Sequence, residues 1–211
     1  MYVALFILIT ILSIGITLSI KLKLISLKFA YLGLFTLVFL AFLLISNENP
    51  TREQIGIFIP SIDQSIIYLF TTIFICFLLW SFNKFLFKFK HNSFNLHKKW
   101  INHIFFYLII SAPAQEFLFR SFLYFSLLQM GALTLISMTV ISSLLFTTAH
   151  IVFEDNLFIL GTFVMGAIWG FIYFFIPNLI LISLSHAIVG LFAFKQGFIK
   201  KDTFKLRVLP S

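Results

Sequence analysis

The stretch QSIIYLFTTIFICFLLWSF at residues 64–82 decides the fold class. Its 19 residues include no charged side chain. A helix needs about 20 mostly apolar residues to cross the roughly 30 Å hydrocarbon core of a bilayer. The stretch therefore predicts a transmembrane helix.

Six further apolar segments have the same character: residues 1–20, 29–45, 100–128, 132–153, 157–176 and 177–194. The first has no basic amino-terminal region and no small-residue cleavage site, so we expect an uncleaved helix and not a signal peptide. Segment 100–128 is long and contains Pro113, which predicts either one kinked helix or two shorter ones. We therefore predict an all-α polytopic membrane helical bundle of seven to eight transmembrane helices, forming a single integral membrane domain over residues 1–211.

The composition supports a lipid environment. Of the 211 residues, 61% are hydrophobic, 19% aromatic and only 10% charged, whereas soluble domains are about 45–50% apolar and about 25% charged. This excludes a disordered chain, a nucleic-acid-binding arm and an ordinary cytosolic enzyme. The single cysteine, Cys76, excludes a disulfide framework and a cysteine-based metal site. The partner expected from composition is membrane lipid, and nucleic acid is not expected.

The net charge of +8 is distributed unevenly along the chain. Basic residues gather in loops 21–28 and 83–99 and in the tail after residue 194. Seven spans with the amino terminus outside place 13 of the 14 basic loop and tail residues in the cytoplasm, as the positive-inside rule requires. We therefore expect an integral protein of a bacterial inner (plasma) membrane, with its carboxyl terminus cytoplasmic.

Four ionisable side chains lie inside the predicted spans: Glu116, Arg120, His150 and His186. Such residues cost about 2.5–3.5 kcal/mol each on insertion scales, so they indicate a buried polar site. Glu116 and Arg120 are four residues apart and share a helix face, where the simplest interpretation is an internal ion pair.

Two chemistries fit these side chains. Glu116 and His150 would activate water as general base and proton shuttle, with His186 and backbone groups stabilising an oxyanion. Alternatively, Glu116, His150 and His186 would bind zinc and leave one position for water. Spacing alone does not separate the two.

Three short motifs resemble those of the CPBP family, the CAAX-protease and bacteriocin-processing intramembrane proteases also labelled Abi. APAQEFLFR at residues 112–120 resembles the E-E-x-x-x-R motif, with Glu116 and Arg120 at its second glutamate and its arginine. FTTAH at 146–150 matches F-x-x-x-H, and HAIVG at 186–190 approaches H-x-x-x-N. Together the three motifs cover a core of about residues 100–194.

The resemblance implies a helical membrane protease, of glutamic or metal-dependent type, that cleaves membrane-associated substrates. It implies that the glutamate pair and His150 activate water and that His186 and an asparagine stabilise the oxyanion. Phe146 is the aromatic residue of the second motif. Two residues depart from the pattern: the first glutamate is Gln115, and the asparagine position is Gly190.

These departures keep a second function open. A catalytically impaired family member would act as a membrane binding, immunity or scaffold protein. A small transporter with a proton relay is a third possibility, against which the absence of an inverted repeat argues. Retention of Glu116, Arg120, Phe146, His150 and His186 favours the protease.

Overall fold

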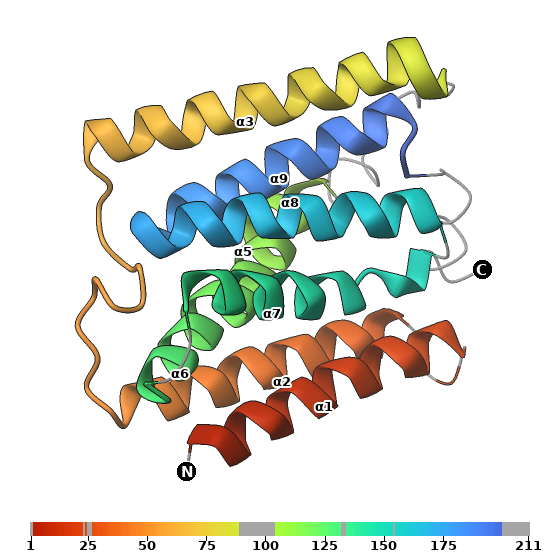
Figure 1. Ribbon diagram of the computed structural model, residues 1–211. Coiled ribbons are helices and arrows are strands. Elements are labelled where there is room, and N and C mark those ends of the chain that lie inside the picture. Colours follow the sequence, from red (N-terminus) through yellow and green to blue (C-terminus); the bar gives the residue numbers. More distant parts are fainter. Residues whose placement is uncertain are drawn as a thin grey trace. The chain divides into compact units, whose positions relative to one another are not determined.

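The structure is a computed structural model that describes residues 2–22, 24, 27–88, 104–131, 134–153 and 155–199. This part of the chain contains helices joined by turns and no strand (Figure 1). The basic linker beyond residue 88 and the basic tail beyond residue 199 lie outside the described residues.

Helices occur at each predicted span. They are α1 (Tyr2–Lys21), α2 (Leu27–Ser46), α3 (Ile62–Phe82) with the π-helical η1 (Asn83–Phe87), η2 (Tyr107–Ser111, π-helical), α5 (Ala112–Glu116), η3 (Phe117–Phe122, π-helical), α6 (Leu123–Gln129), α7 (Leu135–Thr148) with the 3₁₀ turn η4 (Ile151–Phe153), α8 (Asn156–Phe175) and α9 (Leu179–Gln196). Four are long and apolar enough to cross a membrane, namely Ile62–Phe87, Leu135–Phe153, Asn156–Phe175 and Leu179–Gln196. Shorter apolar stretches lie in α1 and α2. The predicted all-α membrane bundle is confirmed.

Polar side chains start three of the long helices. Ser61 and Gln64 form a reciprocal capping box at α3. Thr134 caps α7 by accepting a bond from Ser137 N–H, and Asp155 caps α8 by accepting two N–H bonds. Such caps satisfy amide groups that a helix end leaves without partners, and they explain where these spans begin.

Pro113 does not interrupt helical structure in its own neighbourhood, because helical residues lie on both sides of it. Proline has no N–H to donate and its ring collides with the carbonyl four residues earlier. Before Pro113 the backbone changes to a wider π turn, in which Ala112 N–H donates to the Tyr107 carbonyl five residues earlier. Isolated π turns of this kind are frequent at functional sites.

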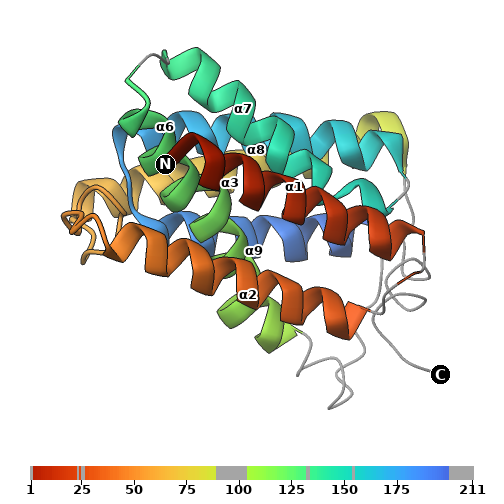
Figure 2. The same ribbon diagram turned by 90° about the horizontal axis from the view of Figure 1, so that it is seen from below.

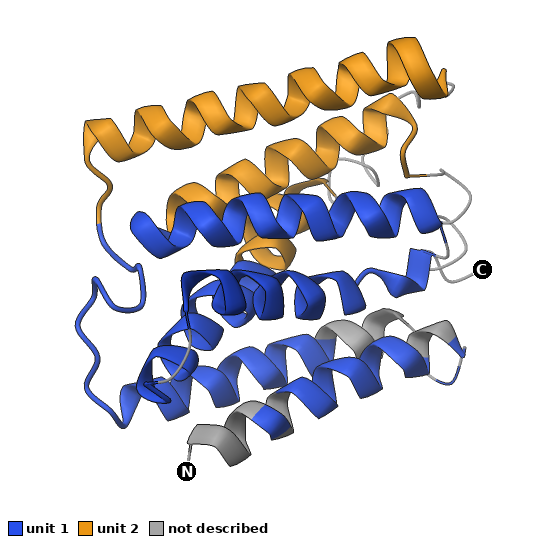
Figure 3. Ribbon diagram, viewed as in Figure 1, with its two compact units in different colours: residues 1–58, 114–179 blue, residues 59–113, 180–211 orange. Residues whose placement is uncertain are grey.

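The chain divides into two compact units, each built from two separate stretches (Figure 3). Unit 1 comprises Met1–Phe58 and Ala114–Leu179, and unit 2 comprises Ile59–Pro113 and Ile180–Ser211. The single membrane domain predicted over residues 1–211 stays a prediction.

In unit 1, α1 lies beside α2 and α7 packs on α8 (Figures 1 and 2). The α7–α8 pair is antiparallel. A Cβ at Gly166 would lie 3.3 Å from Ser143 Cα, and one at Gly170 would lie 3.5 Å from Thr139 Cγ2. Gly166 and Gly170 form a G-x-x-x-G pair, the pattern that lets membrane helices approach closely.

In unit 2, α3 and α9 run parallel in a constant register. Thr72 Oγ1 donates to Ser185 Oγ at 2.7 Å, and Asn83 Nδ2 donates to the Gln196 carbonyl at 2.9 Å, both across a separation of 113 residues. Successive membrane spans alternate in direction. Two parallel spans are therefore separated by an even number of steps in the order of spans along the chain. The third and seventh predicted spans satisfy this condition, and the number of crossings stays a prediction.

The loop between α2 and α3 is anchored inside unit 1. Its Ile55 carbonyl accepts bonds from Ser121 Oγ at 2.7 Å and from Tyr173 OH at 3.2 Å. Leu179 N–H donates to the Gly56 carbonyl at 2.8 Å. Gly56 has φ +71, and a Cβ there would lie 2.6 Å from Tyr173 OH. Only glycine meets both conditions without strain.

Candidate active site

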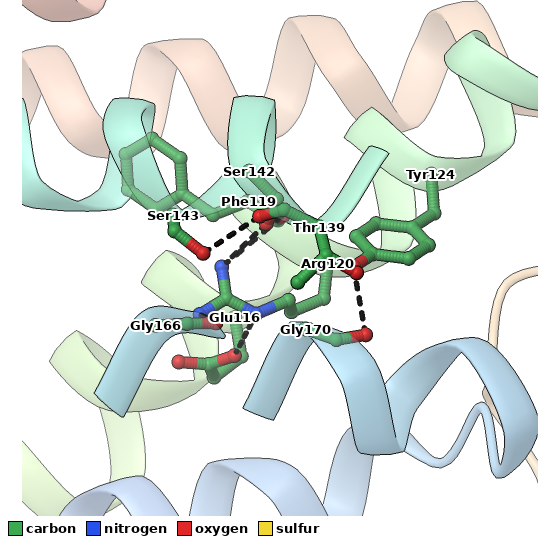
Figure 4. A network of polar contacts seen from close by, with 9 residues as sticks. All are labelled: Glu116, Phe119, Arg120, Tyr124, Thr139, Ser142, Ser143, Gly166 and Gly170. Atoms are coloured by element: carbon green, nitrogen blue, oxygen red, sulfur yellow. Dashed lines mark hydrogen bonds and ion pairs between the residues drawn. The ribbon is translucent and has the colours of Figure 1, made fainter. Parts of the chain in front are cut away.

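Glu116 and Arg120 form a buried ion pair one helical turn apart. Arg120 Nε lies 3.4 Å from Glu116 Oε2, and both side chains are 0% exposed. Glu116 ends α5, and Arg120 lies in the π-helical η3 (Figure 4). The ion pair predicted from the spacing of four residues is confirmed.

Three further groups hold the Arg120 guanidinium. Nη1 donates to Ser142 Oγ at 2.9 Å and to the Phe119 carbonyl at 3.3 Å, and Nη2 donates to the Gly166 carbonyl at 3.4 Å. The guanidinium carbon also lies 4.9 Å from the centre of the Phe146 ring, a cation–π distance. Arg120 is therefore bonded to η3, α7 and α8 at once (Figure 4).

The glycines of α8 make this network possible. Because Gly166 and Gly170 carry no side chains, their carbonyls lie within reach of neighbouring helices. The Gly166 carbonyl accepts from Arg120, and the Gly170 carbonyl accepts from Tyr124 OH at 2.7 Å (Figure 4). Ser142 Oγ in turn donates to the Phe119 carbonyl at 2.7 Å. The Nη atoms of the Arg120 guanidinium are thus hydrogen-bonded on the side away from Glu116, which offsets part of the loss of water.

His150 lies just after α7, in an aromatic environment. Its Nδ1 is 2.8 Å from the Phe146 carbonyl. A carbonyl only accepts hydrogen bonds, so Nδ1 carries the proton and Nε2 is the basic nitrogen of the neutral ring. The rings of Phe146, Phe153 and Phe158 lie 4.6, 6.0 and 5.9 Å away. The imidazole is half-buried.

Phe146 joins the first two motifs. Its ring contacts the Arg120 guanidinium on one side and the His150 ring on another. It also meets Phe119 edge-on at 5.9 Å and Trp169 at 6.2 Å. The structure therefore brings Arg120, Phe146 and His150 together within unit 1.

The third motif lies in unit 2. His186 is a buried residue of α9, and the Tyr107 ring meets it edge-on at a centroid distance of 6.0 Å. The hydroxyl of Tyr107 lies against Gly190, where a Cβ would collide with it. The structure thus groups His186, Gly190 and Tyr107.

The remaining predicted residue is Gln115, which is half-buried in α5. It precedes Glu116 and so points in a different direction around the helix. Its role stays a prediction.

Sequence reasoning missed several residues of these clusters. Ser142 and Gly166 were not singled out, because only packing brings them to Arg120. Tyr107 was missed as well. The one indirect signal for it was Gly190, a small residue where the resembled motif carries an asparagine.

In the described part of the chain, no three His, Cys, Asp or Glu side chains form a group that could hold a metal ion. Glu116 and His150 belong to unit 1 and His186 to unit 2, so the zinc set of these three residues stays a prediction.

A comparison with known protein families gives one match. The family model described as type II CAAX prenyl endopeptidase Rce1-like matches residues 97–192. No curated protein and no solved structure matches the chain. The matched region contains all three motifs, from Gln115 to Gly190. The match over residues 97–192 supports a likeness to the CPBP/CAAX-protease family.

Proposed function

We propose that this protein is an intramembrane endopeptidase that hydrolyses peptide bonds of membrane-associated substrates with water activated by Glu116 and His150. The observation that carries the proposal is the buried Glu116–Arg120 pair, joined through Phe146 to His150. A charged pair with no exposed surface is expensive in a membrane protein and points to a function.

The reaction follows from the roles of these groups. Glu116 accepts a proton from water as the water oxygen attacks the peptide carbonyl carbon. His150 orients the water through Nε2, its basic nitrogen. It shares the proton of the water with Glu116. His186 donates to the oxygen that becomes negative. The carbon–nitrogen bond then breaks as the proton passes to the departing amine.

Arg120 acts as a positioning residue in this scheme. It balances the charge of Glu116 and holds the carboxylate in one direction through its bonds to α7 and α8. With glutamine at position 115, Glu116 is the one carboxylate of the first motif that can accept the proton, because an amide does not accept it.

A specific observation favours one alternative. Gln115 and Gly190 replace two residues to which the resembled family assigns catalytic roles. A catalytically impaired member would keep the fold and bind a membrane peptide, as an immunity or scaffold protein does. In a metal-dependent version, Glu116, His150 and His186 would hold zinc.

We further place the protein in a bacterial inner membrane with the amino terminus outside and the carboxyl terminus cytoplasmic. The basic loops and the parallel register of α3 and α9 support this orientation. Reporter fusions at the carboxyl terminus that become active outside the cytoplasm would contradict it.

The decisive experiment is cleavage of membrane-tethered reporter peptides, prenylated and unmodified, by the purified full chain in liposomes. Glu116→Gln and His150→Ala should each lower cleavage by about 100- to 10,000-fold. Glu53→Gln, an exposed glutamate outside the long helices, is the matched control and should keep full activity.

A zinc chelator separates the two chemistries, since only the metal-dependent version loses cleavage when it is added. Peptides that are bound but not cleaved by any version support the impaired member and contradict the peptidase.

A further inference from the structure

The face of α9 that carries the third motif is covered by Tyr107. His186 and Gly190 are four residues apart, so they lie on the same helix face. The Tyr107 ring stands edge-on to the His186 ring, with an interplanar angle of 84°. One tyrosine therefore contacts both motif positions within unit 2.

Gly190 and the Tyr107 phenol fit each other. A Cβ on residue 190 would collide with the Tyr107 hydroxyl oxygen and lie 2.9 Å from Cζ and 3.2 Å from Cε1. The hydroxyl thus occupies the place from which a side chain at position 190 would start. A larger residue at 190 and the present position of Tyr107 exclude each other.

We propose that Tyr107 supplies the second oxyanion donor of the peptidase, in place of the side chain that Gly190 lacks. The inference rests on the proposed function. When water adds to the peptide carbonyl, the carbonyl electron pair moves onto oxygen, and the Tyr107 O–H and His186 donate hydrogen bonds to it. The phenol keeps its proton throughout, and no bond to tyrosine forms or breaks.

The local backbone favours a fixed phenol. Tyr107 opens the π turn η2, whose wider backbone ring is closed by the bond from Ala112 N–H to the Tyr107 carbonyl. The ring is half-buried and in contact with a buried histidine. Donors that are held in place before the reaction are the ones that stabilise an oxyanion well.

Two serines of α9 are the rival donors. Ser185 Oγ accepts a bond from Thr72 on α3 at 2.7 Å, so it is engaged on another side. Ser183 is buried, and its Oγ has no hydrogen-bond partner among the described residues. It lies three residues before His186, at the end away from Gly190. Ser183→Ala is therefore the matched control.

The test compares the kinetics of wild type, Tyr107→Phe and Ser183→Ala on a reporter peptide that the wild type cleaves. Tyr107→Phe keeps the ring and removes only the hydroxyl. It should lower kcat by about 100- to 1,000-fold and leave KM unchanged, because the donor acts on the oxyanion only in the transition state. Ser183→Ala should leave kcat unchanged.

A transplanted donor gives a second readout. Tyr107→Ala opens the space beside residue 190, and the double variant Tyr107→Ala/Gly190→Asn places an amide there. This double variant should cleave at least about tenfold faster than Tyr107→Ala. A purely structural tyrosine would not be rescued in this way.

The outcomes are distinct. Equal kcat values for wild type and Tyr107→Phe overturn the inference and leave the peptidase standing. Loss of activity in Ser183→Ala instead assigns the donor to Ser183. A wild type that cleaves none of the peptides overturns the peptidase, and with it the role of Tyr107.

Discussion

Replacing Arg120 with methionine tests whether the buried pair is one energetic unit. Methionine keeps a long side chain but removes the positive charge 3.4 Å from Glu116 Oε2. At that distance, the attraction between unit charges is about 5 kcal/mol for an effective dielectric constant of about 20. Much of it is offset by the loss of water around both groups, but a single unpaired buried charge costs roughly 3–5 kcal/mol.

The variant also removes the hydrogen bond to Ser142 at 2.9 Å and the bonds to two carbonyls. We therefore expect Arg120→Met to lose about 3–5 kcal/mol of stability. For a chain of this size this corresponds to a melting temperature lower by roughly 6–20 °C.

The assay is thermal unfolding in one fixed detergent, with Arg120→Met, Glu116→Gln and the double variant side by side. Glu116→Gln leaves the buried Arg120 guanidinium without its carboxylate, but the guanidinium keeps its bonds to Ser142 and to two carbonyls, so this variant should cost less than Arg120→Met. The double variant should recover much of the loss, because it buries no net charge. All three variants should cleave peptide at least about 100-fold more slowly than the wild type, and cleavage is measured separately from the melting temperature.

The reasoning is refuted if Arg120→Met melts within about 2 °C of the wild type. It is refuted as well if the double variant is no more stable than Arg120→Met. Either result would mean that Glu116 does not need the guanidinium in order to stay buried.

Three further substitutions test other features. Gly56→Ala places a Cβ at φ +71 and 2.6 Å from Tyr173 OH; it should destabilise by about 1–3 kcal/mol, and an unchanged melting temperature would contradict the strained-turn argument. Asp155→Ala removes the acceptor of two amide bonds at the start of α8; we expect a loss of about 1 kcal/mol, with Asp155→Asn as the control that keeps the cap. Gly166→Leu puts a large side chain where a Cβ would already lie 3.3 Å from Ser143 Cα; it should force α7 and α8 apart and cost roughly 3 kcal/mol or more, while full stability and full cleavage would show that their close approach is dispensable.

Much of the fold was predictable because each span is long and continuously apolar. The segment predicted at 64–82 becomes Ile62–Phe82, two residues longer because the Ser61–Gln64 capping box starts the helix earlier. The pairing of Glu116 with Arg120 was also predictable, since residues four apart on one helix meet whatever surrounds them.

Other features of the site depend on contacts between distant segments. The sequence does not indicate which groups bind the Arg120 guanidinium. The packing of α7 and α8 places Ser142 and the Gly166 carbonyl within hydrogen-bond distance of it. The tautomer of His150, in contrast, follows from a local contact, because the Phe146 carbonyl beside Nδ1 lies only four residues earlier.

The sequence by itself determined that the chain is a helical membrane protein with a carboxylate, a guanidinium and two imidazoles in its apolar segments, because apolar length and the cost of charge in lipid are local properties of the chain. The tertiary structure alone decided what surrounds each charged group. Tyr107 meets Gly190 across 83 positions of sequence, and no spacing rule links them; only the packing of η2 on α9 brings a hydroxyl to the place where a side chain is missing.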